Sequence, residues 1–499
     1  MDEIEKNKSN RKRIRRKISV FSFELEPKNI NFNLDNKIIK FVAETAQEFG
    51  VNIYLVGGYV RDLILNKEVK DIDFTIVGDS IAFANYLAKK LNKEPILYER
   101  FRTAMIVTDD YNLEFVGTRK EVYNKESRNP IVKEGSLYDD IARRDFTINS
   151  LAISLNRKNY GELIDFFNGY NDIKDKIIKT PLEPEITFSD DPLRMIRAVR
   201  FAAKLGFKIE EKTIESISKM SERIKIISQE RISDEFLKIL ASDNPEIGIE
   251  LLYKTNLLKY IFPELNDLAG VELVEKSNKI FAHKDVLRHS IKVLENIKSD
   301  TDNVWLRFVA LTHDIAKPAT KKFIDNIGWT FYGHEDLGAK WMKKIFKRMK
   351  FPFENLKYVE TLISLHQRPM QLVDEEVTDS AIRRLAFQAG EYLQDLFTLV
   401  KADITTKNPN LSEQYKNNYE KVFNKVIEVQ EKDKLREFQS PVRGEEIMEI
   451  CNLQPSKKVG LIKKKIEDAI LDGIIDNDYN AAKLYFLENK DKWLEELSN

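Results

Sequence analysis

The chain of 499 residues exceeds the size that one hydrophobic core usually serves, so we expect several domains. Hydrophobic residues make up 42% of the chain and charged residues 32%, which excludes an intrinsically disordered protein. Lysine plus arginine and aspartate plus glutamate number 81 each, so the net charge neither favours nor excludes a nucleic-acid partner.

The cysteine content and the apolar runs bear on the compartment. A single cysteine, Cys451, excludes an intrachain disulfide and fits a reducing environment. No apolar run is long enough to cross a bilayer, and the first residues carry no apolar signal core. We therefore expect a cytoplasmic protein with no membrane partner.

Residues 1–25 form a basic N-terminal tail. Six cations lie close together there: Arg11, Lys12, Arg13, Arg15, Arg16 and Lys17. We expect the tail to be solvated. The alternative is a phosphate-binding arm, because clustered cations release counterions when they meet RNA.

Residues 26–180 alternate helical and strand patterns, as in a compact α/β unit. The expected elements are a helix over 39–49, a strand over 53–56, a short helix ending at Leu65, a strand over 71–77 and a hairpin of 102–108 with 113–119. Beyond Ser189 helical periodicity prevails. We expect three further parts there, over 181–275, 276–410 and 411–499.

Two aspartates on the strand over 71–77 are the first candidates for chemistry. Asp71 and Asp73 share one face, because side chains alternate along a strand. Carboxylates held this close repel one another unless a cation lies between them, and Mg²⁺ prefers such oxygen ligands. Glu114, on the predicted hairpin, offers a third carboxylate.

A glycine pair lies upstream of these aspartates, between a predicted strand and a predicted helix. Gly57 and Gly58 let backbone N–H groups approach a triphosphate, and Arg61 can reach the same phosphates one turn later. The set suits phosphoryl transfer to an RNA 3′-hydroxyl. The alternative is a surface strand with two solvated aspartates after a glycine turn.

The string LVGGYVRDLILNKEVKDIDFTIVGD, residues 55–79, resembles the family of tRNA CCA-adding enzymes and bacterial poly(A) polymerases, in the polymerase-β superfamily. The segments RRDFTIN, residues 143–149, and DDPLR, residues 190–194, are similar to later motifs of that family. The resemblance implies that Asp71, Asp73 and Glu114 serve the catalytic Mg²⁺. It also implies that Gly58, Arg61 and Arg144 hold the incoming nucleotide.

Residues 190–205 predict a helix with a charged stripe. Ser189 or Asp190 can cap this helix, and Pro192 fits its first turn. The stripe recurs every three residues and consists of Asp191, Arg194, Arg197 and Arg200. The residues expected to face the core are Met195, Ile196, Val199 and Ala203.

Three arginines in line with one acid favour base and phosphate recognition over a row of surface ion pairs, which is the alternative. The resemblance implies that an acidic residue and an arginine, here Asp191 and Arg194, hydrogen-bond the pairing edge of the base. Asp190 departs from the glutamate with which the family usually begins this motif.

All five histidines lie between residues 283 and 366. The candidate ligands are His289, His313 with the adjacent Asp314, His334, His366 and the later Asp403. Imidazoles combined with carboxylates suit transition-metal ions or magnesium, and two ions can be held. A single buried histidine would more often be a core residue, so the prediction depends on the whole set.

This order resembles the HD phosphohydrolase domain, over about residues 280–410. The resemblance implies His289, His313, Asp314 and Asp403 as core ligands of a divalent metal whose identity the sequence does not give. It implies His334 and His366 as secondary ligands, while His283 has no clear role. A hydrolase that trims RNA ends and a metal-binding scaffold that helps hold tRNA remain alternatives.

The resemblances imply a multidomain α+β protein: a polymerase-β-like palm with a mixed sheet, an all-α neck and body, an all-α HD domain and a helical tail. Basic residues of the tail that could grip RNA are Lys457, Lys458, Lys463, Lys464 and Lys465, although a solvated helix face is the alternative.

The activity implied is the addition of C, C and A from CTP and ATP to a tRNA 3′ end, with release of pyrophosphate. Residues 98–104 lack the Gly-basic-basic-Phe segment typical of poly(A) members, which favours CCA addition. Poly(A) addition and C-only or A-only addition remain alternatives. An HD phosphohydrolase with a noncatalytic RNA-binding front domain is an alternative of another class.

Overall fold

The computed structural model describes residues 30–124, 127–276, 279–282, 285–325, 327–372, 378–406, 408–433 and 440–496. The basic N-terminal tail and His283 lie outside the described residues, so what was expected of them stays a prediction. The chain divides into two compact units, residues 1–190 and 191–499. Within the described residues, no helix has the length and apolar character that crossing a membrane requires.

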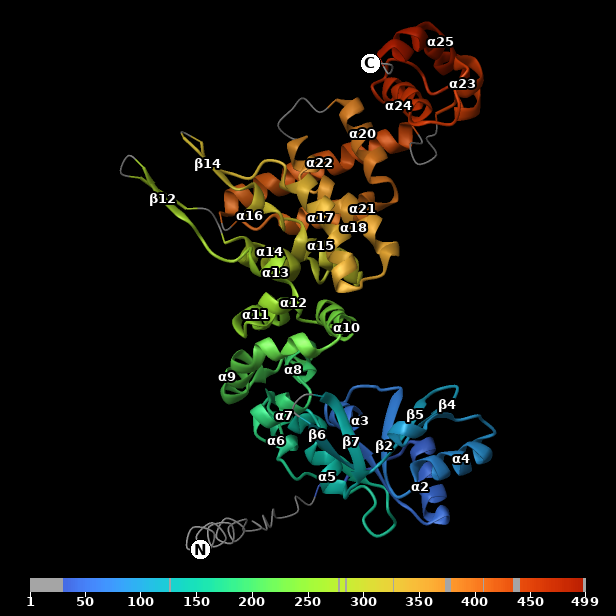
Figure 1. The fold of residues 1–499 in the computed structure, drawn as a ribbon, viewed down its shortest axis with the longest axis vertical. Helices are drawn as coiled ribbons and strands as arrows, with labels where there is room; N and C mark the ends of the chain where they lie inside the picture. Colours follow the sequence, from blue (N-terminus) through green and yellow to red (C-terminus); the bar gives the residue numbers. More distant parts are fainter. Residues whose placement is uncertain are drawn as a thin grey trace, which may run out of the picture. The chain divides into compact units, whose positions relative to one another are not determined.

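A seven-stranded mixed sheet forms the centre of the first unit (Figure 1). Its strands follow the order β3 (Ile96–Tyr98), β4 (Thr103–Val107), β5 (Asn112–Gly117), β2 (Asp71–Val77), β1 (Asn52–Val56), β8 (Ala152–Ser154) and β9 (Leu163–Ile164). β2 and β5 run parallel, and the other neighbouring strands run antiparallel. The predicted strands, hairpin and mixed sheet are confirmed.

Helices cover one face of this sheet. α2 (Lys37–Phe49) and α4 (Ser80–Leu91) pack against each other and against the strands, and α3 (Gly57–Ile64) follows β1 directly. Phe74 of β2 and Phe115 of β5 stack with ring centroids 4.9 Å apart beneath this layer, and Phe83 of α4 meets Phe115 edge-on. Phe74 and Phe115 therefore lie on the face covered by these helices, and Asp71, Asp73 and Glu114 alternate to the opposite face.

Between β5 and β8 the chain forms the hairpin of β6 (Arg119–Asn124) and β7 (Ser127–Glu134) and then α5 (Leu137–Ala142). After β9 it forms α6 (Gly169–Lys174), β10 (Ile177–Ile178) and α7 (Pro184–Asp190). α5 begins with a capping box, in which the Ser136 hydroxyl accepts from the Asp139 N–H and the Asp139 carboxylate accepts from the Ser136 N–H.

The second unit is predominantly helical. Its first helices are α8 (Leu193–Leu205), α9 (Glu211–Met220), α10 (Gln229–Leu240), α11 (Pro245–Lys254), α12 (Leu257–Ile261) and α13 (Pro263–Asn266). The next are α14 (Val286–Ile297), α15 (Val304–Thr312), α16 (Lys317–Thr320), α17 (His334–Met349), α18 (Leu356–Leu365), α19 (Arg368–Gln371), α20 (Asp379–Ala389) and α21 (Leu393–Asp403). The last are α22 (Pro409–Asp433), α23 (Gly444–Cys451), α24 (Lys457–Leu471) and α25 (Tyr479–Glu496).

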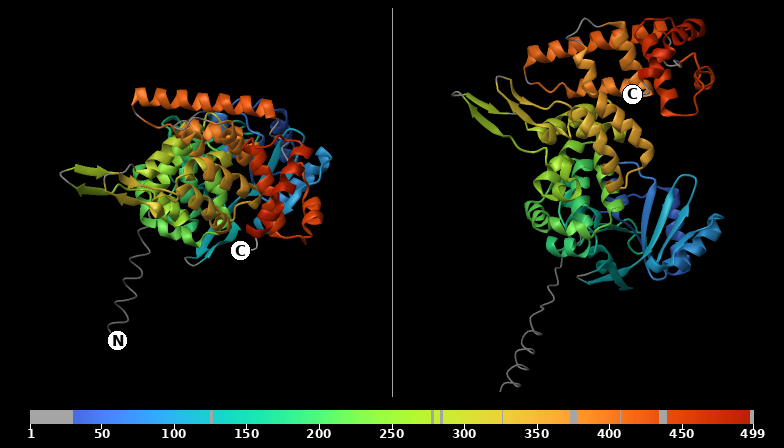
Figure 2. Two further views of the ribbon diagram at one scale, coloured as in Figure 1. Left: turned by 90° about the horizontal axis from the view of Figure 1, so that it is seen from above. Right: turned by 45° about the horizontal axis from the view of Figure 1, so that its top comes forward.

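Two short hairpins accompany these helices and were not predicted. β12 (Leu273–Lys276) pairs with β13 (Lys279–Ala282), and β14 (Lys322–Ile324) pairs with β15 (Gly328–Thr330). The two hairpins extend from the same side of the helical unit and touch through β13 and β15 (Figures 1 and 2). The long helix α22 packs along α20 and α21 (Figure 2).

A buried arginine joins the first helices of the second unit to the later ones. Arg307 of α15, 5% exposed, donates to the carbonyls of Leu240 and Ser242 at 3.0 and 3.1 Å and to the Lys298 carbonyl at 2.9 Å. The last carbonyls of a helix have no partner within the helix, so this guanidinium satisfies the end of α10. Arg307 thereby connects the first helices of the second unit to the later ones through hydrogen bonds to main-chain carbonyls.

Replacing this arginine tests the fastening. Arg307→Ala leaves four carbonyls without this donor, because Thr301 also accepts from Arg307, at 3.0 Å; the cost is about 1–3 kcal/mol for each one that stays buried and unpaired. We expect the free energy of unfolding of the second unit to fall by about 3 kcal/mol or more in urea titrations. Lys292→Ala removes an exposed lysine that pairs with Glu295 on the same helix, so this variant should change the free energy of unfolding little. Equal losses in both variants would contradict this account.

Candidate functional site

Three carboxylates lie on the face of the first unit's sheet opposite Phe74 and Phe115. The parallel register of β2 and β5 pairs Asp73 with Glu114 and Asp71 with Asn112. The Asn112 side-chain amide donates to Asp71 Oδ1 at 2.8 Å, which orients that carboxylate. Ile72 and Phe74 on the opposite face are fully buried, as predicted from the alternation. The structure therefore brings Asp71, Asp73 and Glu114 together.

The electrostatics of this cluster favour a bound cation. Burial raises the pKa of Asp73 to about 6; the Glu114 and Asp71 carboxylates add to the rise, and the guanidiniums of Arg144 and Arg61 oppose it. Burial likewise raises the pKa of Glu114. Neighbouring carboxylates whose ionisation is opposed by burial and by one another's charge fit a divalent cation, which takes oxygen ligands and offsets that repulsion.

The glycine pair at the start of α3 lies directly beside Asp73. Gly57 has a φ of +69°, and a Cβ added there would come 2.8 Å from Arg144 Nη1 and 3.3 Å from Asp73 Oδ2. A Cβ at Gly58 would lie 3.6 Å from Arg61 Nη2. A side chain at Gly57 would therefore fill the space between the carboxylate and the guanidinium. The N-terminus of α3 can offer backbone N–H groups to phosphate there.

Arg144 is held over this cluster by an aspartate that the sequence analysis did not identify. Asp140 of α5 is fully buried, lies 3.3 Å from the Arg144 guanidinium and also pairs with Arg143. Burial opposes its ionisation, but the two guanidiniums hold the pKa of Asp140 below its ordinary value. Thr75 of β2 donates its hydroxyl to the same carboxylate at 3.2 Å. Arg144 follows the end of α5, four residues after Asp140, and this short spacing was the available signal.

Arg61 is placed differently from its expected role. Its side chain is 4% exposed, donates to both Asp62 oxygens at 2.8 and 2.7 Å and donates to Asn149 Oδ1 at 2.7 Å. Asn149 in turn donates to Asp145 at 3.0 Å. Arg61 thus ties the glycine turn to the segment that carries Arg144, and its contact with phosphate stays a prediction.

The predicted charged stripe lies on α8 of the second unit. Asp191, Arg194, Arg197 and Arg200 are each partly exposed, and the residues between them are buried. Met195, Ile196, Val199 and Ala203 face the core as predicted. The capping prediction is wrong: Ser189 and Asp190 are the last residues of α7, and Asp191 Oδ1 accepts from the Leu193 N–H at 3.1 Å. α7 continues through the expected cap because the chain turns only at Asp191 and Pro192.

Two residues of α10 complete the stripe and were missed. Arg231 lies 3.2 Å from Asp191 Oδ2. Glu235, 3% exposed, pairs with Arg200 at 3.0 Å and with Arg197 at 3.9 Å. The premise of a single acid among three arginines was therefore wrong, because a second acid comes from another helix. Two of the arginines are held by ion pairs, which fixes their guanidiniums in place.

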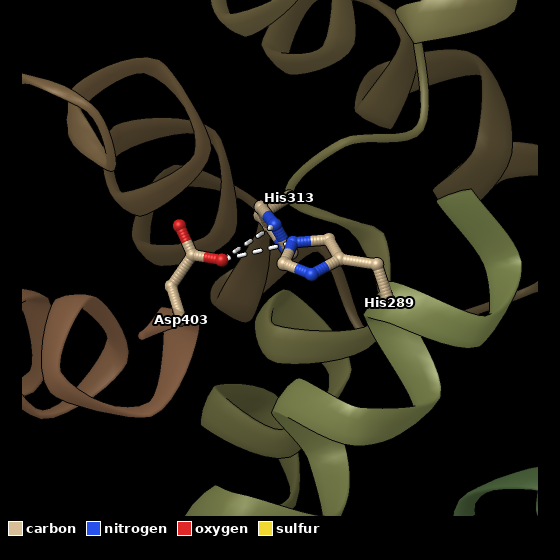
Figure 3. A group of neighbouring side chains, drawn as sticks. All are labelled: His289, His313 and Asp403. Carbon is tan, nitrogen blue, oxygen red and sulfur yellow. Dashed lines mark ion pairs between the residues drawn. The ribbon is translucent and has the colours of Figure 1, made fainter. Parts of the chain in front are cut away.

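A second cluster, in the second unit, gathers the other predicted ligands around Asp314. Nε2 atoms of four imidazoles approach its carboxylate: His334 at 3.1 Å, His313 at 3.3 Å, His289 at 3.5 Å and His366 at 3.7 Å. Asp403, at the end of α21, lies 2.9 Å from His289 Nε2 and 3.6 Å from His313 Nε2, with its carboxylate directed between the two rings (Figure 3). The structure therefore brings all six predicted ligands together.

Hydrogen bonds on the far side of each ring set the imidazole orientation. Nδ1 donates to a backbone carbonyl in His313 (Ala310, 2.9 Å), His334 (Phe331, 2.8 Å) and His366 (Ile363, 2.7 Å). A carbonyl only accepts, so the hydrogen is on Nδ1, and Nε2 faces the cluster. His289 Nδ1 is bonded to the Thr405 hydroxyl at 3.0 Å. Such bonds are typical of histidines that ligate metals.

The buried atoms of this cluster fit a metal. His313 Nε2, His366 Nε2 and Asp314 Oδ1 are buried without a hydrogen-bond partner. Two overlapping groups have ligand atoms within 4.8 Å of one another: His289, His313 and Asp403; and His313, Asp314 and His366. Nitrogen and oxygen donors in this arrangement suit a divalent transition metal or magnesium. Only His289 and Asp403 are appreciably exposed, so the cluster opens to solvent on their side.

Comparison with known proteins agrees with both clusters. Family models match at residues 53–179 (poly A polymerase head domain), 206–268 (probable RNA and SrmB-binding site of polymerase A) and 286–386 (HD domain). The multifunctional CCA protein of Haemophilus influenzae is 32% identical over 374 residues, which cover 71% of this chain and 84% of that protein. The chain belongs to the tRNA nucleotidyltransferase and poly(A) polymerase family.

Other similar proteins match this chain over different shares of their own length. The A-adding tRNA nucleotidyltransferase of Aquifex aeolicus is 33% identical over 308 residues, 61% of this chain and 35% of that protein, so the chain spans about a third of its length. A solved structure of a CCA-adding enzyme without ligand matches with a TM-score of 0.60 at 23% identity, over 91% of this chain and 92% of that chain. The head domain with a mixed sheet and the helical body expected for the family are thereby confirmed.

The pKa of Asp73 predicts a pH-dependent stability. Its folded-state value, about 6, exceeds the ordinary 3.8, so ionisation costs the folded state free energy as the pH rises through 6. In EDTA near neutral pH, Asp73→Asn should stabilise the protein by about 1–2 kcal/mol, allowing for partial exposure. Near pH 4 the variant and the parent should unfold alike, because the carboxyl is already protonated. Thermal unfolding of the variant and the parent measures the stability difference at both pH values. A difference that does not change with pH would contradict the raised pKa of Asp73.

The matched control for that measurement is Asp110→Asn, which changes an exposed aspartate on the turn between β4 and β5. It should unfold like the parent at both pH values.

Metal binding at the second cluster can be measured by thermal unfolding. In protein carrying Asp71→Asn and Asp73→Asn, stripped with EDTA, adding Mn²⁺, Ni²⁺, Zn²⁺ or Mg²⁺ singly should raise the unfolding temperature of the second unit for at least one ion. A free ion at 100 times its Kd stabilises by about 2.7 kcal/mol. His289→Ala should abolish that rise, and Asp302→Asn, a fully exposed aspartate, should preserve it. A rise that survives His289→Ala would place the ion elsewhere.

Proposed function

We propose that the chain adds C, C and A, from CTP and ATP, to the 3′ end of tRNA and releases pyrophosphate. The observation that carries the proposal is the set of three neighbouring carboxylates beside a glycine turn, which suits metal-dependent nucleotidyl transfer. Family membership and the names of the relatives support it. Since tRNA is the substrate proposed, we also propose the cytoplasm as its place of action.

The palm residues divide the work of phosphoryl transfer. Asp71, Asp73 and Glu114 would hold Mg²⁺, which neutralises charge on the phosphates and lowers the pKa of the attacking hydroxyl. The backbone N–H groups at Gly57 and Gly58 and the Arg144 guanidinium bind the triphosphate. No side chain has to form a covalent intermediate, because positioning and charge neutralisation supply the catalysis.

In this proposal the charged stripe at α8 selects the incoming nucleotide. Asp191 accepts from, and Arg194 donates to, the pairing edge of the incoming base. Arg231 holds Asp191 at 3.2 Å, and Glu235 holds Arg200 at 3.0 Å. Polar groups that are fixed in this way reject bases that leave them unpaired, which is the physical basis of discrimination.

RNA is held by other parts of the second unit in this proposal. Residues 206–268 match the RNA-binding family model. The five tail lysines expected to grip the RNA backbone lie on α24, where Lys465 also pairs with Glu496 at 2.6 Å. The domain boundaries expected from the sequence within residues 191–499 stay part of this proposal.

A second activity is favoured by the cluster around Asp314. Four imidazoles and two carboxylates, with three unpartnered buried atoms, would hold one or two divalent ions that can activate water against a phosphate ester. We propose a phosphohydrolase there, acting on RNA ends, which depends on the metal binding described above. If the palm proved inactive, this cluster would carry the main activity.

The product of extension tests the main proposal. Purified protein with Mg²⁺ and tRNA lacking its CCA, given CTP and ATP, should add C, C and A and then stop, as resolved at single-nucleotide length. Asp71→Ala and Asp73→Ala should each lower the rate by about a thousandfold, the equivalent of several kcal/mol of transition-state stabilisation, while RNA binding persists. Asp110→Ala should retain activity.

The other outcomes assign sister specificities. A single A would match the activity named for the Aquifex relative, only Cs would indicate the complementary partial enzyme, and a ragged A tail would indicate a poly(A) polymerase. No extension under any of these conditions would overturn the proposal and leave an RNA-binding front domain. Activity that survives Asp71→Ala would contradict the assignment of Asp71 as a ligand of the catalytic metal.

A further inference from the structure

The sheet face that carries the carboxylates continues over β5, β4 and β3 as an apolar surface. The registers of four strands place Asp73, Glu114, Met105 and Ile96 in one row across β2, β5, β4 and β3. The neighbouring rows are Asp71, Asn112 and Val107 on one side, and Val116, Thr103 and Tyr98 on the other. Cross-strand partners share a face, so these apolar side chains lie on the face that carries the carboxylates.

This continuation is exposed. Ile96 of β3 is 45% exposed, Tyr98 of β3 48% and Val107 of β4 46%. On β4, Ala104 and Ile106 alternate with Val107 and are fully buried on the other face, while Leu97 of the edge strand β3 is 37% exposed. Single exposed apolar residues are common, but a contiguous set on an open sheet face marks a binding surface. Because its rows lead directly to the metal-binding carboxylates, the occupant has to reach those carboxylates as well.

The geometry of phosphoryl transfer determines which reactant binds over β5, β4 and β3. Gly57, Gly58 and Arg144, proposed to hold the triphosphate, lie on the β1 side of Asp73, and β5 lies on its other side. The attacking and leaving oxygens are roughly in line, so the 3′-hydroxyl approaches from the side opposite the departing pyrophosphate. The RNA 3′ end must therefore arrive over β5, β4 and β3.

We propose that this surface, made of Ile96, Tyr98, Met105 and Val107, binds the last bases of the RNA primer. Strands are about 4.8 Å apart, which puts Met105 about 5 Å and Ile96 about 10 Å from Glu114, within reach of the last base and the one before it. Bases stack on aromatic and apolar side chains whatever their sequence, as a growing 3′ end requires. The four are positioning residues, and the inference rests on the proposed function.

The kinetic test separates positioning from chemistry. Tyr98→Ala should raise the KM for RNA by about tenfold, the loss of one stacking contact, with kcat and the KM for ATP little changed. Tyr98→Phe keeps the ring and should behave like the parent. Leu97→Ala is the matched control, because Leu97 is 37% exposed on the same strand and alternates to the opposite face. Unchanged KM for RNA in Tyr98→Ala, or an equal effect of Leu97→Ala, would overturn the subsite.

A photocrosslink tests the surface independently of activity. RNA with 5-iodocytidine as its penultimate nucleotide should, on irradiation, label the peptide that contains Tyr98, and Tyr98→Ala should abolish the label. Extension by the parent with labelling only outside residues 96–107 would overturn the subsite and leave the proposed function standing. Labelling at Tyr98 without extension would support the subsite and refute the proposed function. Neither labelling nor extension would overturn both.

Discussion

The parallel pairing of β2 with β5 is the constraint on which the first unit depends. It is the one parallel pair among the described strands of the seven-stranded sheet, and it sets Asp73 directly beside Glu114. A slip of one residue would turn Glu114 toward the helices and bring Leu113 or Phe115 to the open face. Phe74 and Phe115, stacked at 4.9 Å on the covered face, oppose such a slip, so the core enforces the register that the carboxylates need.

The local elements of the palm were accessible from the sequence because short-range patterns determine them. The alternation in 71–77, the glycine pair and the hairpin pattern each involve residues close together in the chain. The partners Arg231 and Glu235 were missed because their contacts depend on how helices pack, whereas Asp140 lies only four residues before Arg144. Glu235 meets Arg200 across two helices, and no spacing in the sequence reports such a meeting. The cap at α8 failed for a related reason, since α7 runs on to Asp190.

The histidine cluster was easier to predict than the charged stripe. Five histidines confined to one stretch form an unusual distribution, so their gathering could be inferred without any knowledge of packing. What the sequence could not give was the hydrogen bonding behind the rings. It could not give the two hairpins either, because the short segments 273–282 and 322–330 carry too few residues for a periodic signal.

The hydrogen bonds behind the imidazoles have a consequence for how the chain can vary. His313, His334 and His366 are each oriented by a carbonyl three residues earlier, an atom that every amino acid supplies. Substitutions at Ala310, Phe331 and Ile363 therefore leave the acceptor itself in place. His289 is oriented by the hydroxyl of Thr405, which only a serine or threonine can offer in that position. Substitutions around the cluster therefore differ in their effect. Replacing Thr405 can remove the hydrogen bond that orients His289, on the side where the cluster opens to solvent. His313, His334 and His366 keep their orienting hydrogen bonds whatever side chain stands three residues earlier.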